Sequence, residues 1–120
     1  MEALNFFIEK FITKNRQERW SSLASGKWDK FASKIDKINE HLNERCVCIK
    51  YNIQEEFESI VIKNRLKRGF FFDRYTFNEE LSPVLFDHVH DDSILIFPDE
   101  KIALLFHHDG WMWYCTLYSK

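Results

Sequence analysis

The C-terminal end of the chain is the feature that most constrains the fold. Residues 93–97, 101–107 and 111–118 form three short runs rich in aromatic and aliphatic side chains, which is typical of β-strands. Asp109-Gly110 separates the last two runs. This pair is a strong hairpin signal, because the turn needs a positive φ that glycine adopts freely. The sequence therefore predicts a three-stranded antiparallel meander.

Both faces of this meander are apolar. In the run 101–107, Leu104 and Phe106 would point to one side, while Ala103 and Leu105 would point to the other. An antiparallel sheet with one face in water instead alternates apolar with polar residues. Either other elements cover both faces, or one face carries an apolar patch that a partner buries. We favour cover on both faces.

Apolar residues recur with helical spacing in three earlier segments. The first stripe consists of Leu4, Phe7, Ile8, Phe11 and Ile12; the second of Trp28, Phe31, Ile35, Ile38 and Leu42; the third of Ile53, Phe57, Ile60 and Val61. Each stripe predicts an amphipathic helix with one buried face. Residues 14–19 interrupt the first stripe, and the Ser-rich segment 21–26 is typical of a turn or a new helix start. The second helix is expected to end near Asn43, and Asn52 is a candidate cap for the third.

Two further segments are predicted as strands. Residues 45–51 are short and alternating, and residues 69–77 are aromatic-rich; residues 78–83 between the second strand and the meander indicate a short turn. The fold class is therefore α+β, with N-terminal amphipathic helices packed on a mainly antiparallel sheet that ends in the meander. With 120 residues and no internal repeat or linker, residues 1–120 are expected to form a single domain.

The sequence carries no membrane or export signal. No apolar run approaches the ~20 residues that span a bilayer, and the N-terminus lacks the basic start and cleavage site of a signal peptide. Three cysteines, an odd and low number, argue against a disulfide framework. We therefore expect a cytoplasmic protein in which Cys46, Cys48 and Cys115 are free thiols.

Charge is distributed unevenly along the chain. Residues 1–68 contain 14 Lys and Arg against 10 Asp and Glu, whereas residues 69–120 contain 3 against 9. The predicted loops and turns hold Asp87, Asp91, Asp92, Asp99, Glu100 and Asp109. If these loops gather at one sheet edge, they make an acidic rim beside Trp111 and Trp113, and all eight residues become candidates for binding a basic partner. The alternative is that acidic residues occupy turns for local hydrogen-bonding reasons.

Two histidine clusters offer a second kind of chemistry. His88 and His90 lie beside Asp87, Asp91 and Asp92, and His107-His108-Asp109 forms a second group. Imidazole and carboxylate ligands could hold a divalent metal and activate water, as in a small metal-dependent hydrolase or nuclease. No established ligand spacing is present, and polar loops explain the same residues. There is also no phosphate-binding glycine loop or nucleophile motif, so we predict neither an enzyme nor a cofactor or metal.

A lysine stripe offers a third possibility. Lys27, Lys30, Lys34 and Lys37 precede the apolar positions of the second predicted helix by one residue, which places them on a neighbouring helix face. Such a stripe could contact phosphates in an adaptor or nucleic-acid-binding module. The interleaved Asp29, Asp36 and Glu40 equally fit an ordinary solvated face.

A family resemblance favours the partner-binding alternative. The acidic residues Asp87, Asp91, Asp92, Asp99 and Glu100 and the aromatic run Trp111-Met112-Trp113-Tyr114 resemble the profile of small bacterial immunity proteins made against polymorphic or contact-dependent toxins. The resemblance implies a protein that binds one cognate toxin, often a basic nuclease, and blocks its active site or substrate surface. It implies neither a membrane partner nor direct binding to nucleic acid.

Overall fold

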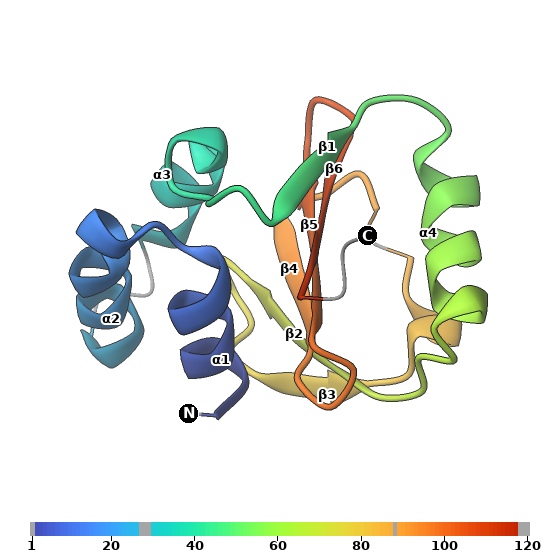
Figure 1. The fold of residues 1–120 in the computed structure, drawn as a ribbon, viewed down its shortest axis with the longest axis horizontal. Coiled ribbons are helices and arrows are strands. Elements are labelled where there is room, and N and C mark those ends of the chain that lie inside the picture. The colour runs from blue at the N-terminus through green and yellow to red at the C-terminus, as the bar shows by residue number, and fades with distance from the viewer. Residues whose placement is uncertain (1, 27–29, 88, 118–120) are drawn as a thin grey trace.

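An antiparallel sheet of six strands forms the middle layer of the protein (Figure 1). The computed structural model describes residues 2–26, 30–87 and 89–117. Its strands are β1 Cys46–Ile49, β2 Gly69–Asp73, β3 Glu79–Leu81, β4 Ser93–Phe97, β5 Ile102–His107 and β6 Trp111–Thr116. Their spatial order is β1-β6-β5-β4-β2-β3, and every neighbouring pair is antiparallel. The predicted meander is therefore confirmed as β4, β5 and β6.

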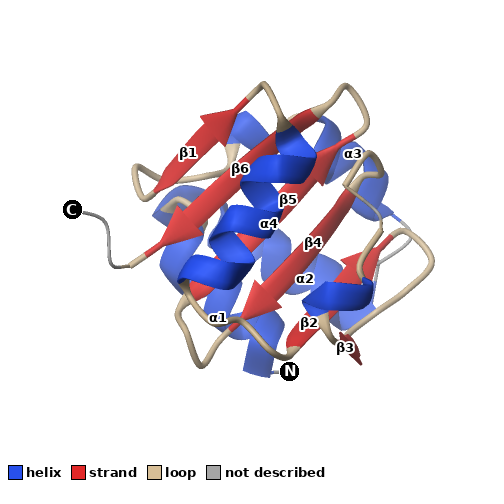
Figure 2. Ribbon diagram, turned by 90° about the vertical axis from the view of Figure 1, so that its right-hand side faces the viewer, coloured by secondary structure: helices blue, strands red, loops and turns tan. Residues whose placement is uncertain are grey.

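Helices cover both faces of this sheet. One face carries α1 Glu2–Phe11, α2 Gln17–Gly26 and α3 Phe31–Asp36, with the 3-10 helices η1 Lys14–Arg16 and η3 Ile38–Glu40 in the connections. The other face carries α4 Ile53–Lys63 and η4 Pro83–Leu85. Figure 2 shows α4 lying across the strands, with α1 and α2 behind them. Among the described residues, no helix has the length and apolar character needed to cross a membrane.

Two apolar cores lie on the two sides of the sheet. Ala103 and Leu105 of β5 join the core under α1, α2 and α3, and Leu104 and Phe106 join the core under α4. Every residue of β4 and β5 is buried. Burial of a Leu, Ile or Phe side chain contributes roughly 1.5–3 kcal/mol, so this central pair of strands anchors both layers. The expected cover on both faces of the meander is confirmed at β4 and β5.

The second predicted helix is wrong in extent. Residues 28–42 do not form one helix: α3 ends at Asp36, and Lys37 has φ −117° and ψ 36°, outside the helical region. The chain then turns to meet the end of α1, where Thr13 N donates to His41 O at 2.8 Å and Asn43 N donates to Phe11 O at 2.9 Å. These long-range hydrogen bonds replace the helical ones. Lys27 and Trp28 lie outside the described residues.

Helix α2 was not predicted, since residues 14–26 were assigned to a break and a turn. It buries Trp20 and Leu23 against the first core. Among the α2 residues whose burial is described, Trp20 and Leu23, three apart, supply the apolar face, which is too few for a recognisable stripe. Docking of the large Trp20 ring stabilises a helix that its own sequence indicates only weakly.

The segment after α4 also departs from the prediction. The expected strand 69–77 ends at Asp73, whose side chain accepts a 2.8 Å hydrogen bond from Tyr75 N. This local bond closes a turn, and the predicted turn region instead contains β3, paired with β2. Helix α4 itself is confirmed at Ile53–Lys63. Asn52 occupies the N-cap position as expected, but it has φ 56° and makes no side-chain capping hydrogen bond.

Candidate functional site

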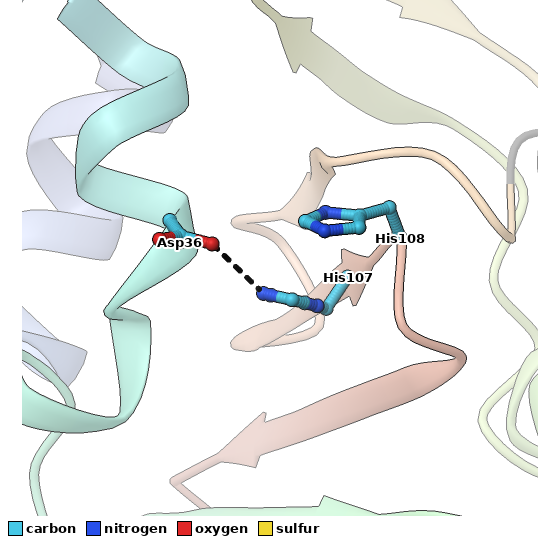
Figure 3. A group of neighbouring side chains, drawn as sticks. All are labelled: Asp36, His107 and His108. Carbon is cyan, nitrogen blue, oxygen red and sulfur yellow. Dashed lines mark ion pairs between the residues drawn. The ribbon is translucent and has the colours of Figure 1, made fainter.

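Three side chains able to hold a metal ion meet beside the β5–β6 turn (Figure 3). Asp36 is the last residue of α3, His107 is the last residue of β5, and His108 opens the turn that Asp109-Gly110 continues. One ligand atom from each of the three lies within 4.8 Å of the others. The packing of α3 over the sheet brings this carboxylate to the two imidazoles.

His107 is the buried member of the group. Its Nδ1 accepts a 3.1 Å hydrogen bond from the backbone N–H of Asp109. Its Nε2 is buried and has no hydrogen-bond partner among the described residues, while Asp36 Oδ1 lies 3.7 Å away. The ring is held between His108 and Trp111, with ring centroids 4.4 Å and 4.8 Å away. Stacking on two sides thus fixes an imidazole whose outer nitrogen points at the carboxylate.

His108 is exposed, but Asp92 holds it in place. The Asp92 carboxylate accepts the backbone N–H of His108 at 2.8 Å and lies 2.9 Å from its Nδ1. The side-chain hydrogen bond to Asp92, with the negative charge of the same carboxylate, raises the pKa of His108. Since Nδ1 donates its proton to Asp92, Nε2 is the nitrogen that remains to face Asp109, whose Oδ1 is 3.6 Å away.

A hollow of about 290 Å³ adjoins this group along β6. It is lined by Asn39, Cys48, Lys50, Trp111 and Trp113. The ammonium group of Lys50 lies 5.5 Å from the centroid of the Trp111 ring, a distance at which a cation is attracted to the ring face. Trp113 Nε1 is buried without a hydrogen-bond partner in the described part of the chain. Both tryptophans are half-buried on the side of α1, α2 and α3, with Trp113 against the first core.

The acidic residues chosen from the sequence do not gather at one edge. Asp91, Asp92 and Asp109 lie at the end of the sheet where β4 begins and β5 ends, since Ser93 pairs with Phe106. Asp99 and Glu100 lie in the β4–β5 turn, at the other end of the same strands. Asp87 follows η4 on the side of α4. The six carboxylates are therefore divided among three places.

The other sequence-derived candidates are also dispersed. His88 lies outside the described residues, and His90 is exposed and takes no part in the Asp36, His107 and His108 group. Lys30 precedes α3, Lys34 lies within it and Lys37 follows it. Because α3 ends at Asp36, the expected lysine stripe does not run along one continuous helix.

Two features escaped the sequence analysis. Asp36 was considered only as a charge interleaved with the lysines, since nothing local relates it to histidines far along the chain. The second is a surface formed by α4 and η4, where Ile62, Val84 and Leu85 are 76%, 80% and 81% exposed. The sequence could have indicated Ile62, because it is an apolar residue outside the apolar stripe of α4, on a helix face that is otherwise polar.

The α4–η4 surface surrounds a groove of about 260 Å³. The groove is lined by Gln54, Phe57, Glu58, Val61, Ile62, Pro83, Val84 and Phe86. Phe57 and Phe86 belong to the second core and pack with ring centroids 5.3 Å apart. The groove is therefore apolar at its base, with exposed aliphatic side chains and a carboxylate at its margin.

Comparisons with family models, curated proteins and solved structures give no match. The function therefore rests on the chain's own surfaces and side chains.

Proposed function

We propose that this protein acts by binding a basic protein partner, and that the α4–η4 surface is the contact: exposed Ile62 and Val84 line its groove, and exposed Leu85 follows Val84 on η4. The observation that carries the proposal is the exposure of two large aliphatic side chains, Ile62 and Val84, that line one groove, with exposed Leu85 next to Val84 in the chain. Contiguous apolar patches rimmed by polar residues are typical of protein interaction sites. The apolar faces of β4 and β5, by contrast, are already covered.

The magnitude of the apolar contribution supports a protein partner. Burial of an exposed Val, Leu or Ile side chain contributes roughly 1.5–3 kcal/mol, so three such side chains can supply the centre of an interface. The groove beside them is open, and its base is formed by packed rings, which favours an inserted side chain from the partner. Exposed aliphatic side chains around a rigid groove are typical of the central part of a protein interface.

Charge around the patch favours a basic partner. Glu55 and Glu58 are exposed on α4, and Glu58 lines the groove. Asp87, one of the residues chosen from the sequence, is exposed just after η4. Complementary charge accelerates association and disfavours acidic competitors. An immunity protein that covers the basic substrate surface of a toxin nuclease has this combination, and we propose that role for the chain.

The test is binding of the purified chain to the toxin candidate encoded by the adjacent gene, measured by calorimetry. Ile62→Glu and Val84→Glu should each weaken binding by about 30-fold or more, since truncation of a central interface side chain costs about 2 kcal/mol. Val47→Glu is the matched control: Val47 is 60% exposed on β1, at the sheet edge opposite β3. Unchanged affinity in both α4–η4 variants would refute this contact surface.

The acidic end of the meander is the second surface to test. Asp91→Lys with Asp109→Lys changes charge there, whereas Asp92 is left in place because it holds His108. If this double variant slows association while the α4–η4 variants bind normally, the contact lies at the β5–β6 turn. Failure of the candidate toxin to bind or to be inhibited would refute the immunity role itself.

A further inference from the structure

The buried Nε2 of His107 is the atom from which a ligand site can be argued. It has no hydrogen-bond partner among the described residues, although most buried polar atoms in folded proteins have one. It points toward Asp36 Oδ1, 3.7 Å away, a separation too long for a hydrogen bond (Figure 3). An imidazole nitrogen facing a carboxylate at this distance leaves room for an ion between them.

We propose that Asp36, His107 and His108 bind one divalent transition-metal ion of the Zn²⁺ type. Two imidazoles and one carboxylate suit Zn²⁺ and its neighbours, whereas Mg²⁺ and Ca²⁺ prefer oxygen ligands alone. This site keeps His107 and His108 of the second histidine cluster in the sequence hypothesis, but α3 supplies the carboxylate through Asp36, and His90 takes no part.

The distances fit one ion, provided that His108 turns out of its stack on His107, because a metal lies in the plane of each imidazole that binds it. Two ligands about 2.0–2.1 Å from a tetrahedral Zn²⁺ lie about 3.3 Å apart, and His107 Nε2 and Asp36 Oδ1 are separated by 3.7 Å. The three ligand atoms lie within 4.8 Å of one another. The side chains of Asp36 and His108 are 59% and 51% exposed, so both have room to move toward the buried His107, with His108 pivoting about its hydrogen bond to Asp92.

A second carboxylate prepares His108 for metal binding, whereas His107 would have to exchange one hydrogen bond. Asp92 accepts the Nδ1 proton of His108 and so leaves Nε2 for the metal, which is the usual support for a metal-bound histidine. For His107, a metal on Nε2 requires the ring proton on Nδ1, whereas in the structure Nδ1 accepts the Asp109 N–H. Asp109 Oδ2 lies 3.7 Å from Nδ1 and would have to move closer to accept that proton. The Asp109 N–H bond to Nδ1 is then given up. Asp92 therefore acts as a positioning residue.

The site would join two layers of the fold. Asp36 ends the short helix α3, and the histidines belong to the sheet end, so one ion would fasten α3 to the β5–β6 turn. Three protein ligands leave a fourth position of a tetrahedral ion to water, on the exposed side of Asp36 and His108.

The test is titration of the metal-stripped full chain with Zn²⁺ against a chromophoric competitor, with thiols kept reduced. We expect one Zn²⁺ per chain, with affinity lowered at least tenfold in Asp36→Asn and in His108→Ala. Asp92→Asn should lower affinity 10- to 100-fold as a supporting carboxylate. Exposed His90→Ala is the matched control and should bind as the wild type does.

Co²⁺ provides a readout that depends on geometry. We expect visible absorption bands of a low-coordinate Co²⁺ complex, together with quenching of Trp111, which stacks on His107. Both signals should be lost in His108→Ala. No Zn²⁺ binding by the wild type would overturn the proposal. So would wild-type affinity in both Asp36→Asn and His108→Ala, because the ion would then lie on other residues such as the Cys46 and Cys48 thiols.

Discussion

The indole N–H of Trp20 donates a buried 3.2 Å hydrogen bond to Nδ1 of His41. Their rings also meet edge-on, with centroids 6.1 Å apart. Trp20 lies on α2 and His41 follows η3, so this pair joins two segments whose structure the sequence analysis did not predict correctly. The bond requires an unprotonated Nδ1 on His41.

Trp20→Phe should therefore destabilise the fold. It removes the donor and leaves His41 Nδ1 buried without a partner, which costs about 1–3 kcal/mol in addition to lost packing. Trp113→Phe is the control, because Trp113 Nε1 has no hydrogen-bond partner among the described residues. Urea unfolding at neutral pH should show the larger loss in Trp20→Phe. A larger loss in Trp113→Phe would contradict this account of the bond.

Stability should fall on mild acidification because of His41. Burial, followed by the nearby charges of Arg16 and Lys34, lowers the pKa of His41 in the folded protein. In the unfolded chain the pKa of His41 is about 6.5, so the unfolded state binds a proton more readily than the folded state does. The contribution of His41 to the stability of the fold is therefore complete above the unfolded pKa, and it is lost as the pH falls toward the lower pKa of the folded state.

Urea unfolding between pH 8 and pH 5 measures this decline. His41→Gln keeps an acceptor for Trp20 but cannot titrate, so its stability should fall less than that of the wild type. Other titrating groups are common to both proteins and cancel in the difference. If the stabilities of the wild type and His41→Gln fall in parallel with pH, the pKa of His41 does not change on folding.

Gly69→Ala should destabilise β2 through contact with the neighbouring strand. A Cβ at this position would lie 2.8 Å from Cε2 of Phe97 and 3.0 Å from Cδ1 of Leu95. Overpacking of this kind costs about 1–3 kcal/mol. Thermal unfolding should show the loss, and the double variant with Phe97→Leu should recover part of it. Without such recovery, contact with the Phe97 ring is not the cause.

The three thiols should differ in reactivity. All are free: Cys115 is buried, while Cys46 and Cys48 are partly exposed. Burial raises the pKa of Cys115 well above the usual thiol value, which suppresses the reactive thiolate. A thiol reagent should find Cys115 unreactive in the native protein and all three thiols reactive in denaturant. Cys115→Ser should leave the number of reactive thiols in the native protein unchanged. A lower number in this variant would contradict the assignment of Cys115 as unreactive.

Part of the candidate site could be predicted from the sequence, and part could not. The sequence predicts the Asp109-Gly110 turn, and with it a position for His107 and His108 at the end of a strand. Asp36 could not be assigned to this site, because its distance from the histidines depends on how α3 packs on the sheet. The acidic residues were recognised as turn residues, but which end of the sheet each turn occupies depends on strand order. The exposure of Val84 and Leu85 depends on how η4 lies against α4.

What the sequence by itself determined is the set of elements whose signals are local and repeated. Helix α1, helix α4 and the β4–β5–β6 meander follow from apolar periodicity and turn chemistry, and cover on both sheet faces follows from the two apolar sides of β5. Only the tertiary structure decided that residues 28–42 break after Asp36 and that residues 17–26 form a helix. The physical reason is competition: backbone bonds from residues 41–43 to the end of α1, and burial of Trp20, outweigh the weak preferences of short segments.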